Sequence, residues 1–280
     1  MTTPRLRLPD LDQAPLGHAT GYPDTYDPAQ LFAVSRTPGR AALGLTDALP
    51  FTGSDLWTAY ELTWLGSRGK PAIAIATIEV PASSASIVES KSMKLYLGSF
   101  AQSSFASADA LVAVIEHDLS TKTGGKVRVT LKDPITFAGE RIAELEGESL
   151  DTLPVDCSVY EVDPASLIAS GAKVDEALTT NLFRSVCPVT GQPDIASMRI
   201  AYRGAQIDRP GLLRYLVSYR RHPGFHEHCV ERIFVDLVSR CRCEQLTINA
   251  RFTRRGGIDI NPFRANAPVA IPPNVRTARQ

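Results

Sequence analysis

The stretch Gln245-Leu-Thr-Ile-Asn-Ala-Arg-Phe-Thr253 alternates apolar and polar residues. Leu246, Ile248, Ala250 and Phe252 share one face of an extended chain here, and polar residues occupy the other face. A period of two predicts a half-buried antiparallel strand. The preceding segment, residues 226–240, has helical spacing of its apolar residues, namely Val230, Ile233, Phe234, Leu237 and Val238. An antiparallel strand beside an amphipathic helix predicts the α+β fold class.

A weak internal repeat extends this prediction to the other half of the chain. Lys94-Leu-Tyr-Leu-Gly-Ser-Phe100 aligns with Arg214-Tyr-Leu-Val-Ser-Tyr219 when Tyr96 is placed on Tyr215. At nearly the same offset, a second helical pattern over residues 107–119, with Ser107 as its cap, matches the helix at 226–240. Two modules of strands, helices and strands are therefore expected, with the helices on one face of each sheet. Chance similarity of short apolar segments is the alternative.

Composition divides the chain into four expected regions. Residues 1–50 are rich in Pro, Gly and Asp and are expected to form an extended arm, and residues 264–280 are expected to form a flexible tail. Between them we expect an N-terminal module at 51–165 and a catalytic C-terminal module at 166–263. Further strands are predicted at 73–80, which Pro81 ends, and at 196–203.

Bulk properties narrow the function classes. The chain has 280 residues, 44% hydrophobic, with 30 basic and 30 acidic side chains and a net charge of zero. That balance argues against a nucleic-acid or membrane partner. The N-terminus lacks the apolar region of a signal peptide, so a cytoplasmic protein is expected. Five widely spread cysteines are not a disulfide framework.

The segment Ser185-Val-Cys-Pro-Val-Thr-Gly-Gln-Pro-Asp194 places a thiol and a carboxylate among turn-forming residues. This combination is typical of a nucleophile with a nearby acid. The alternative for Cys187 is a small buried hydrophobe, and for Asp194 a residue of a turn or helix cap.

A second cluster, Phe225-His-Glu-His228, begins the predicted helix after Pro223-Gly224. The Glu227 carboxylate can accept two parallel N–H donors, as the edge of a guanine requires. The alternative is a first-turn carboxylate favoured by the helix dipole, beside a solvated histidine.

Two further clusters are weaker signals. Glu89-Ser-Lys-Ser-Met-Lys-Leu-Tyr96 is either a charged loop or part of a ligand site, and Arg254-Arg-Gly-Gly257 is either a solvated turn or a phosphate contact. Neither dinucleotide-binding glycine motif nor P-loop is present. The histidines and cysteines from His222 to Cys243 lack the spacing of a complete zinc set, so no metal is expected.

Together these clusters resemble the NADPH-dependent 7-cyano-7-deazaguanine reductases of the queuosine pathway, in their long, two-module form. The resemblance also includes Gly53-Ser-Asp-Leu-Trp57, Tyr60-Glu-Leu-Thr-Trp64, Tyr26-Asp-Pro28 and the run Ile258-Asp-Ile-Asn-Pro262. It implies the tunnelling fold (T-fold), with two ββααββ modules in tandem, and a homodimer or higher homo-oligomer. It further implies reduction of a nitrile to a primary amine through a covalent thioimide, using NADPH.

The resemblance also assigns roles to residues. It implies that Cys187 is the nucleophile and Asp194 the proton donor. It implies two sets of contacts, to the substrate through Val88, Glu89, Ser90, His226 and Glu227, and to NADPH through Ser90, Lys91, Arg255 and Gly256.

Two positions depart from the family pattern. Ile195 stands where an aromatic residue is expected, and His228 where glutamine is expected, so the shape of the pocket around them is in doubt. The alternative functions are a T-fold protein that holds a purine or pterin without catalysis, and a zinc hydrolase similar to GTP cyclohydrolase. The Cys187 and Asp194 pair argues against the first, and the missing zinc set argues against the second.

Overall fold

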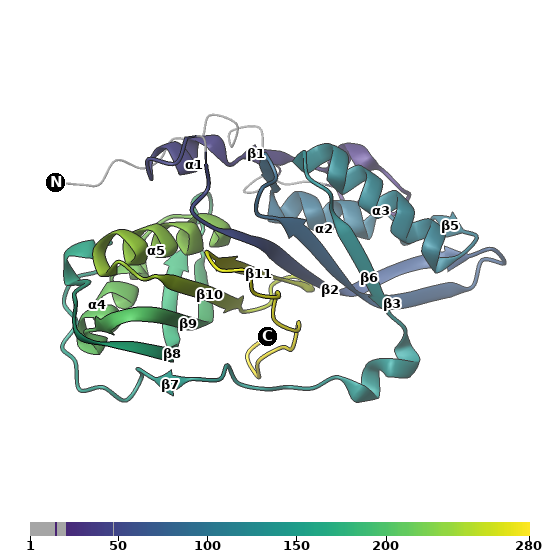
Figure 1. The fold of residues 1–280 in the computed structure, drawn as a ribbon. Helices are drawn as coiled ribbons and strands as arrows, with labels where there is room; N and C mark the ends of the chain where they lie inside the picture. Colours follow the sequence, from purple (N-terminus) through teal and green to yellow (C-terminus); the bar gives the residue numbers. More distant parts are fainter. Residues whose placement is uncertain (1–14, 16–20, 47) are drawn as a thin grey trace. The chain divides into compact units, whose positions relative to one another are not determined.

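A computed structural model describes residues 15, 21–46 and 48–280 (Figure 1). The chain divides into two compact units. Unit 1 comprises the described part of Met1–Ala42, together with Asp55–Arg141 and Arg254–Ile260, and unit 2 comprises Leu43–Ser54, Ile142–Thr253 and Asn261–Gln280. The modules expected from the sequence had contiguous ranges, whereas both units draw on separated stretches of the chain.

Unit 1 is built on a small sheet with the strand order β6-β3-β2, to which β5 adds in parallel beside β2. A separate antiparallel pair joins β1 to β4. The elements are η2 (Pro28–Gln30), β1 (Ala33–Ser35), α1 (Thr37–Ala41), β2 (Thr52–Gly66), β3 (Pro71–Pro81), β4 (Ser86–Val88), α2 (Ser90–Gly98), β5 (Ser104–Phe105), α3 (Ala108–Thr123), β6 (Arg128–Lys132) and η3 (Pro134–Gly139).

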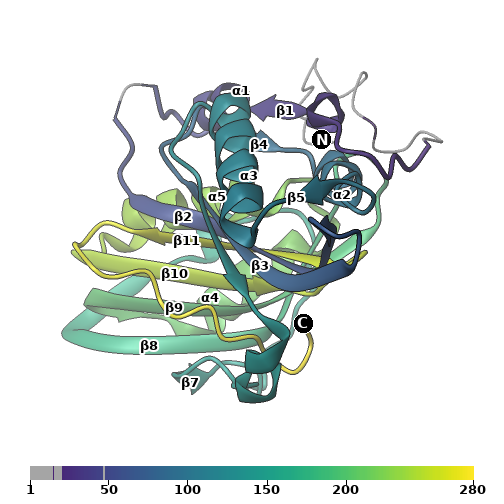
Figure 2. The ribbon, with the colours of Figure 1, turned by 90° about the vertical axis from the view of Figure 1, so that its right-hand side faces the viewer.

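Unit 2 has the strand order β11-β10-β9-β8-β7, antiparallel except for the pair β7 and β8. Helices α4 and α5 lie together on the far side of strands β8 to β10 in Figure 2. The elements are β7 (Glu148–Ser149), η4 (Pro164–Ser166), β8 (Ala169–Val186), β9 (Pro193–Ile207), α4 (Arg209–Ser218), η5 (Tyr219–Arg221), α5 (His226–Cys241), β10 (Gln245–Phe252) and β11 (Ile258–Ala265).

The fold class predicted from the sequence, α+β with mostly antiparallel strands, is confirmed. The four apolar residues that alternate along β10 are completely buried. Helix α5 begins at His226 as predicted, and its apolar stripe is buried except for Val238, which is only partly buried. The helix contacts β8, β9 and β10. Helix α3 begins after Ser107, whose hydroxyl accepts a hydrogen bond from the Ala110 amide at 3.1 Å. None of the helices in the described residues is long and apolar enough to cross a membrane.

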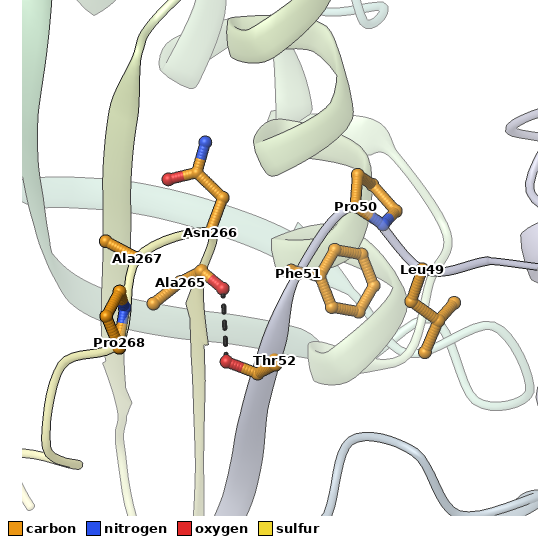
Figure 3. Close-up of a pocket in the computed structure, with 8 residues that line it drawn as sticks. All are labelled: Leu49, Pro50, Phe51, Thr52, Ala265, Asn266, Ala267 and Pro268. Carbon is orange, nitrogen blue, oxygen red and sulfur yellow. Dashed lines mark hydrogen bonds between the residues drawn. The ribbon is translucent and has the colours of Figure 1, made fainter.

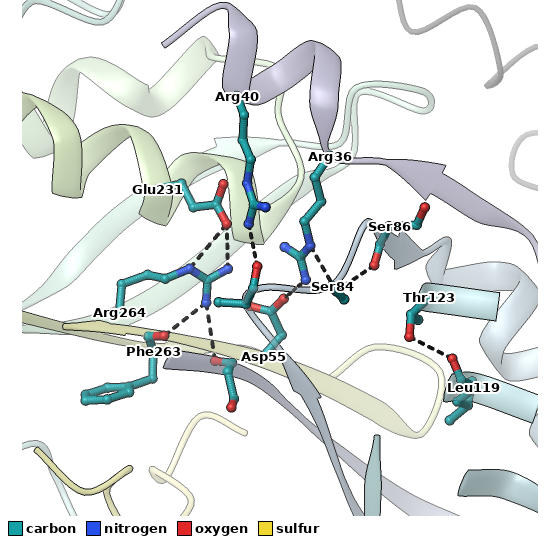
Figure 4. Close-up of polar contacts among 12 residues, drawn as sticks. Arg36, Arg40, Asp55, Ser84, Ser86, Leu119, Thr123, Glu231, Phe263 and Arg264 are labelled. Atoms are coloured by element: carbon teal, nitrogen blue, oxygen red, sulfur yellow. Dashed lines mark hydrogen bonds and ion pairs between the residues drawn. The ribbon is translucent and has the colours of Figure 1, made fainter. Parts of the chain in front are cut away.

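Each unit contains a buried ion pair (Figure 4). In unit 2, Arg264 donates to the Glu231 carboxylate at 2.8 Å and to the Ser54 carbonyl at 3.3 Å, which ties α5 to the sheet. In unit 1, Arg36 contacts Asp55 at 2.5 Å. All four charged side chains are 1% exposed or less. Removing one partner of such a pair costs about 3–5 kcal/mol, because it leaves an uncompensated buried charge.

A matching tyrosine–aspartate contact supports the predicted repeat. In unit 1 the Tyr96 hydroxyl on α2 donates to the Asp118 carboxylate on α3 at 2.7 Å. In unit 2 the Tyr215 hydroxyl on α4 donates to the Asp236 carboxylate on α5 at 2.6 Å. Both tyrosines are completely buried. The alignment that placed Tyr96 on Tyr215 therefore pairs residues that join the two helices of each unit.

The two ends of the chain depart from expectation. Residues 1–14, 16–20 and 47 of the predicted arm lie outside the described residues. The described part of the arm contains the helix α1 and a strand that pairs with β4, so it is not extended throughout. The stretch 264–280 begins within β11, and Gln280 is only 5% exposed because its amide donates to the Phe252 carbonyl and to Asn261. The stretch therefore begins as a strand, and hydrogen bonds hold its last residue to unit 2.

The tyrosine–aspartate contact predicts a stability effect. Tyr215→Phe removes the donor to Asp236 and one partner of the Tyr219 hydroxyl, which lies 2.8 Å from the Tyr215 hydroxyl. We expect a loss of about 1–3 kcal/mol in the free energy of unfolding, measured by urea denaturation. Tyr22→Phe is the control, because Tyr22 is 83% exposed. Equal stability of the two variants would show that the contact does not hold α4 to α5.

Candidate functional site

The loop that carries Cys187 connects β8 to β9 in unit 2. The strands pair as far as Val186 opposite Pro193. Beyond that pair, the Cys187 amide donates to the Gln192 carbonyl at 2.8 Å, which closes the loop. The turn predicted here is thus limited to residues 187–192. Asp194 lies opposite Ser185 within the strand pair and is 7% exposed, so the alternative of a turn or cap aspartate is wrong.

Two hydrogen bonds hold the end of β8 beside the start of α5. The Val186 amide donates to the His222 carbonyl at 3.0 Å, and the Gly224 amide donates to the Val186 carbonyl at 3.1 Å. Gly224 has no room for a side chain, since an added Cβ would lie 3.0 Å from the Cys229 sulfur and 3.3 Å from the His222 ring. These contacts bring the residue before Cys187 next to the segment that leads into His226 and Glu227.

Asp194 and His226 form the polar centre of this region. The His226 Nε2 atom lies 3.2 Å from the Asp194 Oδ1 atom, and the two side chains are 15% and 8% exposed. The imidazole is stacked on the Phe252 ring, with centroids 3.8 Å apart and planes inclined by 3°. Within the described residues, the other ring nitrogen of His226, Nδ1, is buried and has no hydrogen-bond partner. The stack thus holds the plane of the imidazole, and in this orientation its Nε2 edge faces Asp194.

Glu227 is a buried residue in the first turn of α5. It is 2% exposed, so the alternative of a solvated helix start does not hold for this side chain or for His226. The residue before the helix, Phe225, makes no side-chain capping hydrogen bond. A carboxylate in the first turn is favoured there by the helix dipole.

Cys187 differs from three of the other cysteines in its surroundings. Burial raises the pKa of the Cys229 thiol to about 12, with Asp194 and Glu227 adding negative charge nearby. Burial also raises the pKa of Cys241 to about 11 and of Cys243 to about 12. These three thiols remain protonated at neutral pH, and a protonated thiol is a poor nucleophile. Cys187 is half-buried, on a loop, and within the same unit as Asp194 and His226.

The predicted substrate residues of unit 1 occupy the start of α2. Glu89 is completely buried, and its carboxylate accepts hydrogen bonds from the Lys91 amide at 2.6 Å and the Ser92 amide at 2.8 Å. It therefore caps α2. Val88 is 3% exposed, and the Ser90 hydroxyl lies 3.4 Å from the Glu89 carboxylate.

The predicted cofactor residues Arg255 and Gly256 form a tight turn in unit 1. Arg255 and Ile258 exchange two backbone hydrogen bonds at 2.8 and 3.3 Å, and both residues between them, Gly256 and Gly257, have positive φ. Two positive φ angles are the signature of a type I′ turn, which favours Gly-Gly. A Cβ at Gly256 would lie 3.1 Å from the Lys94 side chain of α2. The structure thus brings this turn to the helix that begins at Ser90 and Lys91.

The predicted residues therefore fall into two sets. Unit 2 holds Cys187, Asp194, His226 and Glu227, and unit 1 holds Val88, Glu89, Ser90, Lys91, Arg255 and Gly256. The pocket drawn in Figure 3 includes none of them and is lined by Leu49, Pro50, Phe51, Thr52, Ala265, Asn266, Ala267 and Pro268 of unit 2. In the part of the chain that the structure describes, no group of three or more His, Cys, Asp or Glu side chains is arranged to hold a metal ion.

The sequence did not single out Phe252, His222 or Gly224 as parts of the site. The alternation along β10 predicted that Phe252 is buried, but not that it stacks on His226. The Pro223-Gly224 dipeptide marked a turn before the helix, but the partner of that turn, Val186, is distant in the sequence. Only the folded chain reveals these two relationships.

Comparison with known proteins supports the resemblance read from the motifs. The family described as "Nitrile reductase, 7-cyano-7-deazaguanine-reductase N-term" matches residues 22–131, and the family "QueF-like protein" matches residues 193–269. The chain is 54% identical over 271 residues to the NADPH-dependent 7-cyano-7-deazaguanine reductase of Burkholderia multivorans, an alignment that covers 96% of this chain and 99% of the relative. The enzyme of Burkholderia cenocepacia is 55% identical over 273 residues, with the same coverage.

Among solved structures, the apo form of the archaeosine synthase QueF-Like matches 36% of this chain and 99% of its own. The match has a TM-score of 0.30 and 16% sequence identity. It is too slight to bear on the fold of this chain.

The stack of Phe252 on His226 predicts an effect on activity. Phe252→Leu frees the imidazole to turn away from Asp194, so we expect turnover to fall about tenfold or more, with a smaller change in substrate affinity. Phe183→Leu is the matched control, because Phe183 is equally buried and touches Phe252 edge-on at 6.0 Å without touching His226. Both variants remove a buried ring and should lose similar stability. An equal loss of turnover in both would assign the effect to the core and not to the stack.

His222 predicts a pH-dependent stability. Burial, with the charge of Arg232, lowers the pKa of His222 to about 4, against an unfolded value near 6.5. The unfolded chain binds the proton more tightly than the folded chain. The free energy of unfolding therefore falls by about 3 kcal/mol as the pH drops from about 6.5 to 4. We expect His222→Gln to lose less stability over this range, measured by urea denaturation at each pH. A slope identical to that of the wild type would contradict the assignment.

Proposed function

We propose that this chain, which belongs to the 7-cyano-7-deazaguanine reductase family, reduces the nitrile of 7-cyano-7-deazaguanine to a primary amine with NADPH as reductant. The observation that carries the proposal is the arrangement in unit 2, where the half-buried Cys187 directly follows β8 and Asp194 pairs with His226 at the start of α5. A nucleophile, an acid and a buried carboxylate on one unit are the groups that this reaction needs. The extent of the match to the Burkholderia reductases supports the same activity.

Cys187 begins the reaction by adding to the nitrile carbon, which is a modest electrophile suited to a thiolate. The carbon–sulfur bond forms as an electron pair moves to the nitrile nitrogen. Asp194 then delivers a proton to that nitrogen, and the product of this step is a thioimide on Cys187. His226, at 3.2 Å from the Asp194 carboxylate, is placed to orient that proton and to replace it.

NADPH, when bound, supplies the two hydrides that convert the thioimide first to an imine and then to the amine. Cys187 is released as a thiolate between these steps, when the carbon–sulfur bond breaks. The proton that the second step consumes again comes through Asp194, because among the described residues it is the carboxylic acid that pairs with the imidazole at the start of α5.

Substrate recognition falls to Glu227 and His226 in this proposal, together with Val88, Glu89 and Ser90. The buried Glu227 carboxylate suits the N–H donors of a guanine-like ring. A charge-assisted hydrogen bond of that kind contributes about 1.5–3 kcal/mol. Glu89 already accepts two backbone amides as the cap of α2, so any contact with the substrate would use its remaining acceptor capacity.

The cofactor residues in the proposal are Ser90, Lys91, Arg255 and Gly256. Their setting fits a dinucleotide, since the turn at Gly256 has no side chain and adjoins the Lys94 amine. Arg254 next to it stacks over the Tyr60 ring, with the guanidinium carbon 4.4 Å from the centroid. Cationic side chains around a glycine turn suit phosphate groups.

Membership of the family also leads us to propose the T-fold for each module, a homodimer or higher homo-oligomer, a cytoplasmic location and a place in queuosine biosynthesis. The matching helix pairs joined by Tyr96 and Tyr215 support a duplicated module. The strand and helix order of unit 2, with two strands, two helices and two strands from β8 to β11, supports the ββααββ pattern.

The test is an assay of NADPH oxidation with 7-cyano-7-deazaguanine, followed at the nicotinamide absorbance. The wild type should oxidise two NADPH for each nitrile. Asp194→Asn keeps the shape of the side chain but cannot deliver a proton, so we expect about 10²–10⁴-fold slower oxidation. Wild-type activity should also fall on the alkaline side, because Asp194 must be protonated when it acts. Near-normal rates in Asp194→Asn would transfer the acid role to another group, and an inactive wild type would overturn the proposed function.

A further inference from the structure

We infer that the backbone amide of Thr190 is a catalytic group, because it donates a hydrogen bond to the Cys187 sulfur at 3.5 Å. The inference rests on the proposed function, in which Cys187 is the nucleophile. It adds an N–H donor to the attacking atom itself. Gly191, which fixes the direction of this donor, is then a positioning residue.

The amide, the carbonyl and the sulfur of Cys187 all form hydrogen bonds within the loop. Its amide donates to the Gln192 carbonyl at 2.8 Å, its carbonyl accepts from the Gly191 amide at 3.0 Å, and its sulfur accepts from the Thr190 amide. This is the pattern of a helix N-cap, in which a side chain accepts from the amide three residues on. Pro188 follows the cap position, where proline is favoured because its missing N–H is not needed. The thiol therefore caps a single helical turn.

Gly191 ends this turn in the left-handed conformation, with φ of +70°. A side chain at this position meets nothing within 4 Å, so the need for glycine comes from the backbone angle and not from crowding. A residue with a Cβ resists a positive φ, except asparagine and aspartate, which tolerate it better. A change at Gly191 thus moves the Thr190 amide without disturbing the packing of the unit.

The amide has a defined task in each half of the cycle. Before attack, the N–H donor holds the sulfur in one orientation and stabilises the negative charge of the attacking atom. When the carbon–sulfur bond forms, a lone pair of the sulfur becomes the new bond, and a π pair of the nitrile moves to the nitrogen, which takes a proton from Asp194. When that bond breaks, the pair returns to sulfur, and the Thr190 amide again stabilises the negative charge.

The experiment compares Gly191→Ala with Gly171→Ala. Gly171 lies at the other end of β8, also has a positive φ of +88°, and also has nothing within 4 Å of an added side chain. Both variants carry a similar backbone strain, and urea denaturation checks that both fold. Gly191→Asn is the conservative variant expected to restore the turn. The first readout is the rate at which iodoacetamide alkylates Cys187 at pH 7, without substrate or NADPH, with the modified residue identified by peptide mass mapping.

We expect Gly191→Ala to alkylate about tenfold more slowly than the wild type, the change that follows from losing one hydrogen bond to a charged group. We expect Gly171→Ala to match the wild type and Gly191→Asn to recover most of the rate. The turnover number should fall with the alkylation rate, while the Michaelis constant changes less.

An unchanged alkylation rate in Gly191→Ala, or an equal loss in Gly171→Ala, would overturn the inference. Failure of the proposed function gives a different result, since the wild-type Cys187 would then be alkylated readily but would form no adduct with 7-cyano-7-deazaguanine. The two outcomes are therefore distinguishable in the same set of proteins.

Discussion

The exchange of backbone hydrogen bonds between Val186 and the His222–Gly224 segment is the constraint on which the rest of unit 2 depends. It fastens the end of β8 to the entrance of α5, two elements that are distant in the sequence. Gly224 lies close to the Cys229 sulfur, since an added Cβ would be 3.0 Å from it, so the backbone that leads into α5 packs tightly against the helix. Cys187 directly follows β8, Asp194 lies on the paired strand β9, and His226 and Glu227 lie at the start of α5. A shift of β9 by one residue in this pairing would send Asp194 to the opposite face of the sheet.

The two units join their helix pairs in the same way but differ in how the helix starts are stabilised. Each joins its helices by a buried tyrosine that donates to an aspartate. In unit 1 the helix starts are satisfied by side chains, with Glu89 capping α2 and Ser107 capping α3. In unit 2 the start of α5 has no such side-chain cap, and the polar residues there, His226 and Glu227, are buried instead. Polar groups are buried at a cost in stability unless they are paired, and His226 meets this need through Asp194 at 3.2 Å.

The sequence predicted those features that local periodicity determines. Alternation predicted β10, helical spacing predicted α5 and the cap at Ser107, and the offset between Tyr96 and Tyr215 predicted the repeat.

The sequence was a poor guide where the structure of a residue depends on contacts with residues that are distant in the sequence. A turn was the alternative for Asp194, because Gly191 and Pro193 precede it, yet the pairing of β9 with β8 includes Asp194 and makes it a buried strand residue. The tail read as loose because of its prolines, yet the Gln280 amide finds partners on Phe252 and Asn261. The stack of His226 on Phe252 also joins residues that are distant in the sequence, and the residues around each ring do not predict the other as its partner. The motifs around Cys187 and Glu227 named candidate site residues, whose roles stay predictions, and the fold shows which elements of unit 2 carry them.

Intact-protein mass spectrometry can show whether Cys187 attacks the nitrile, as the proposed reaction requires. Wild-type protein mixed with 7-cyano-7-deazaguanine, without NADPH, should gain the full mass of the substrate, because thiol addition to a nitrile expels no group. Peptide mapping should place the added mass on Cys187, and Cys187→Ala should keep its mass although it folds. An unmodified wild type that nevertheless binds the substrate, or an adduct on one of the other four cysteines, would contradict the account.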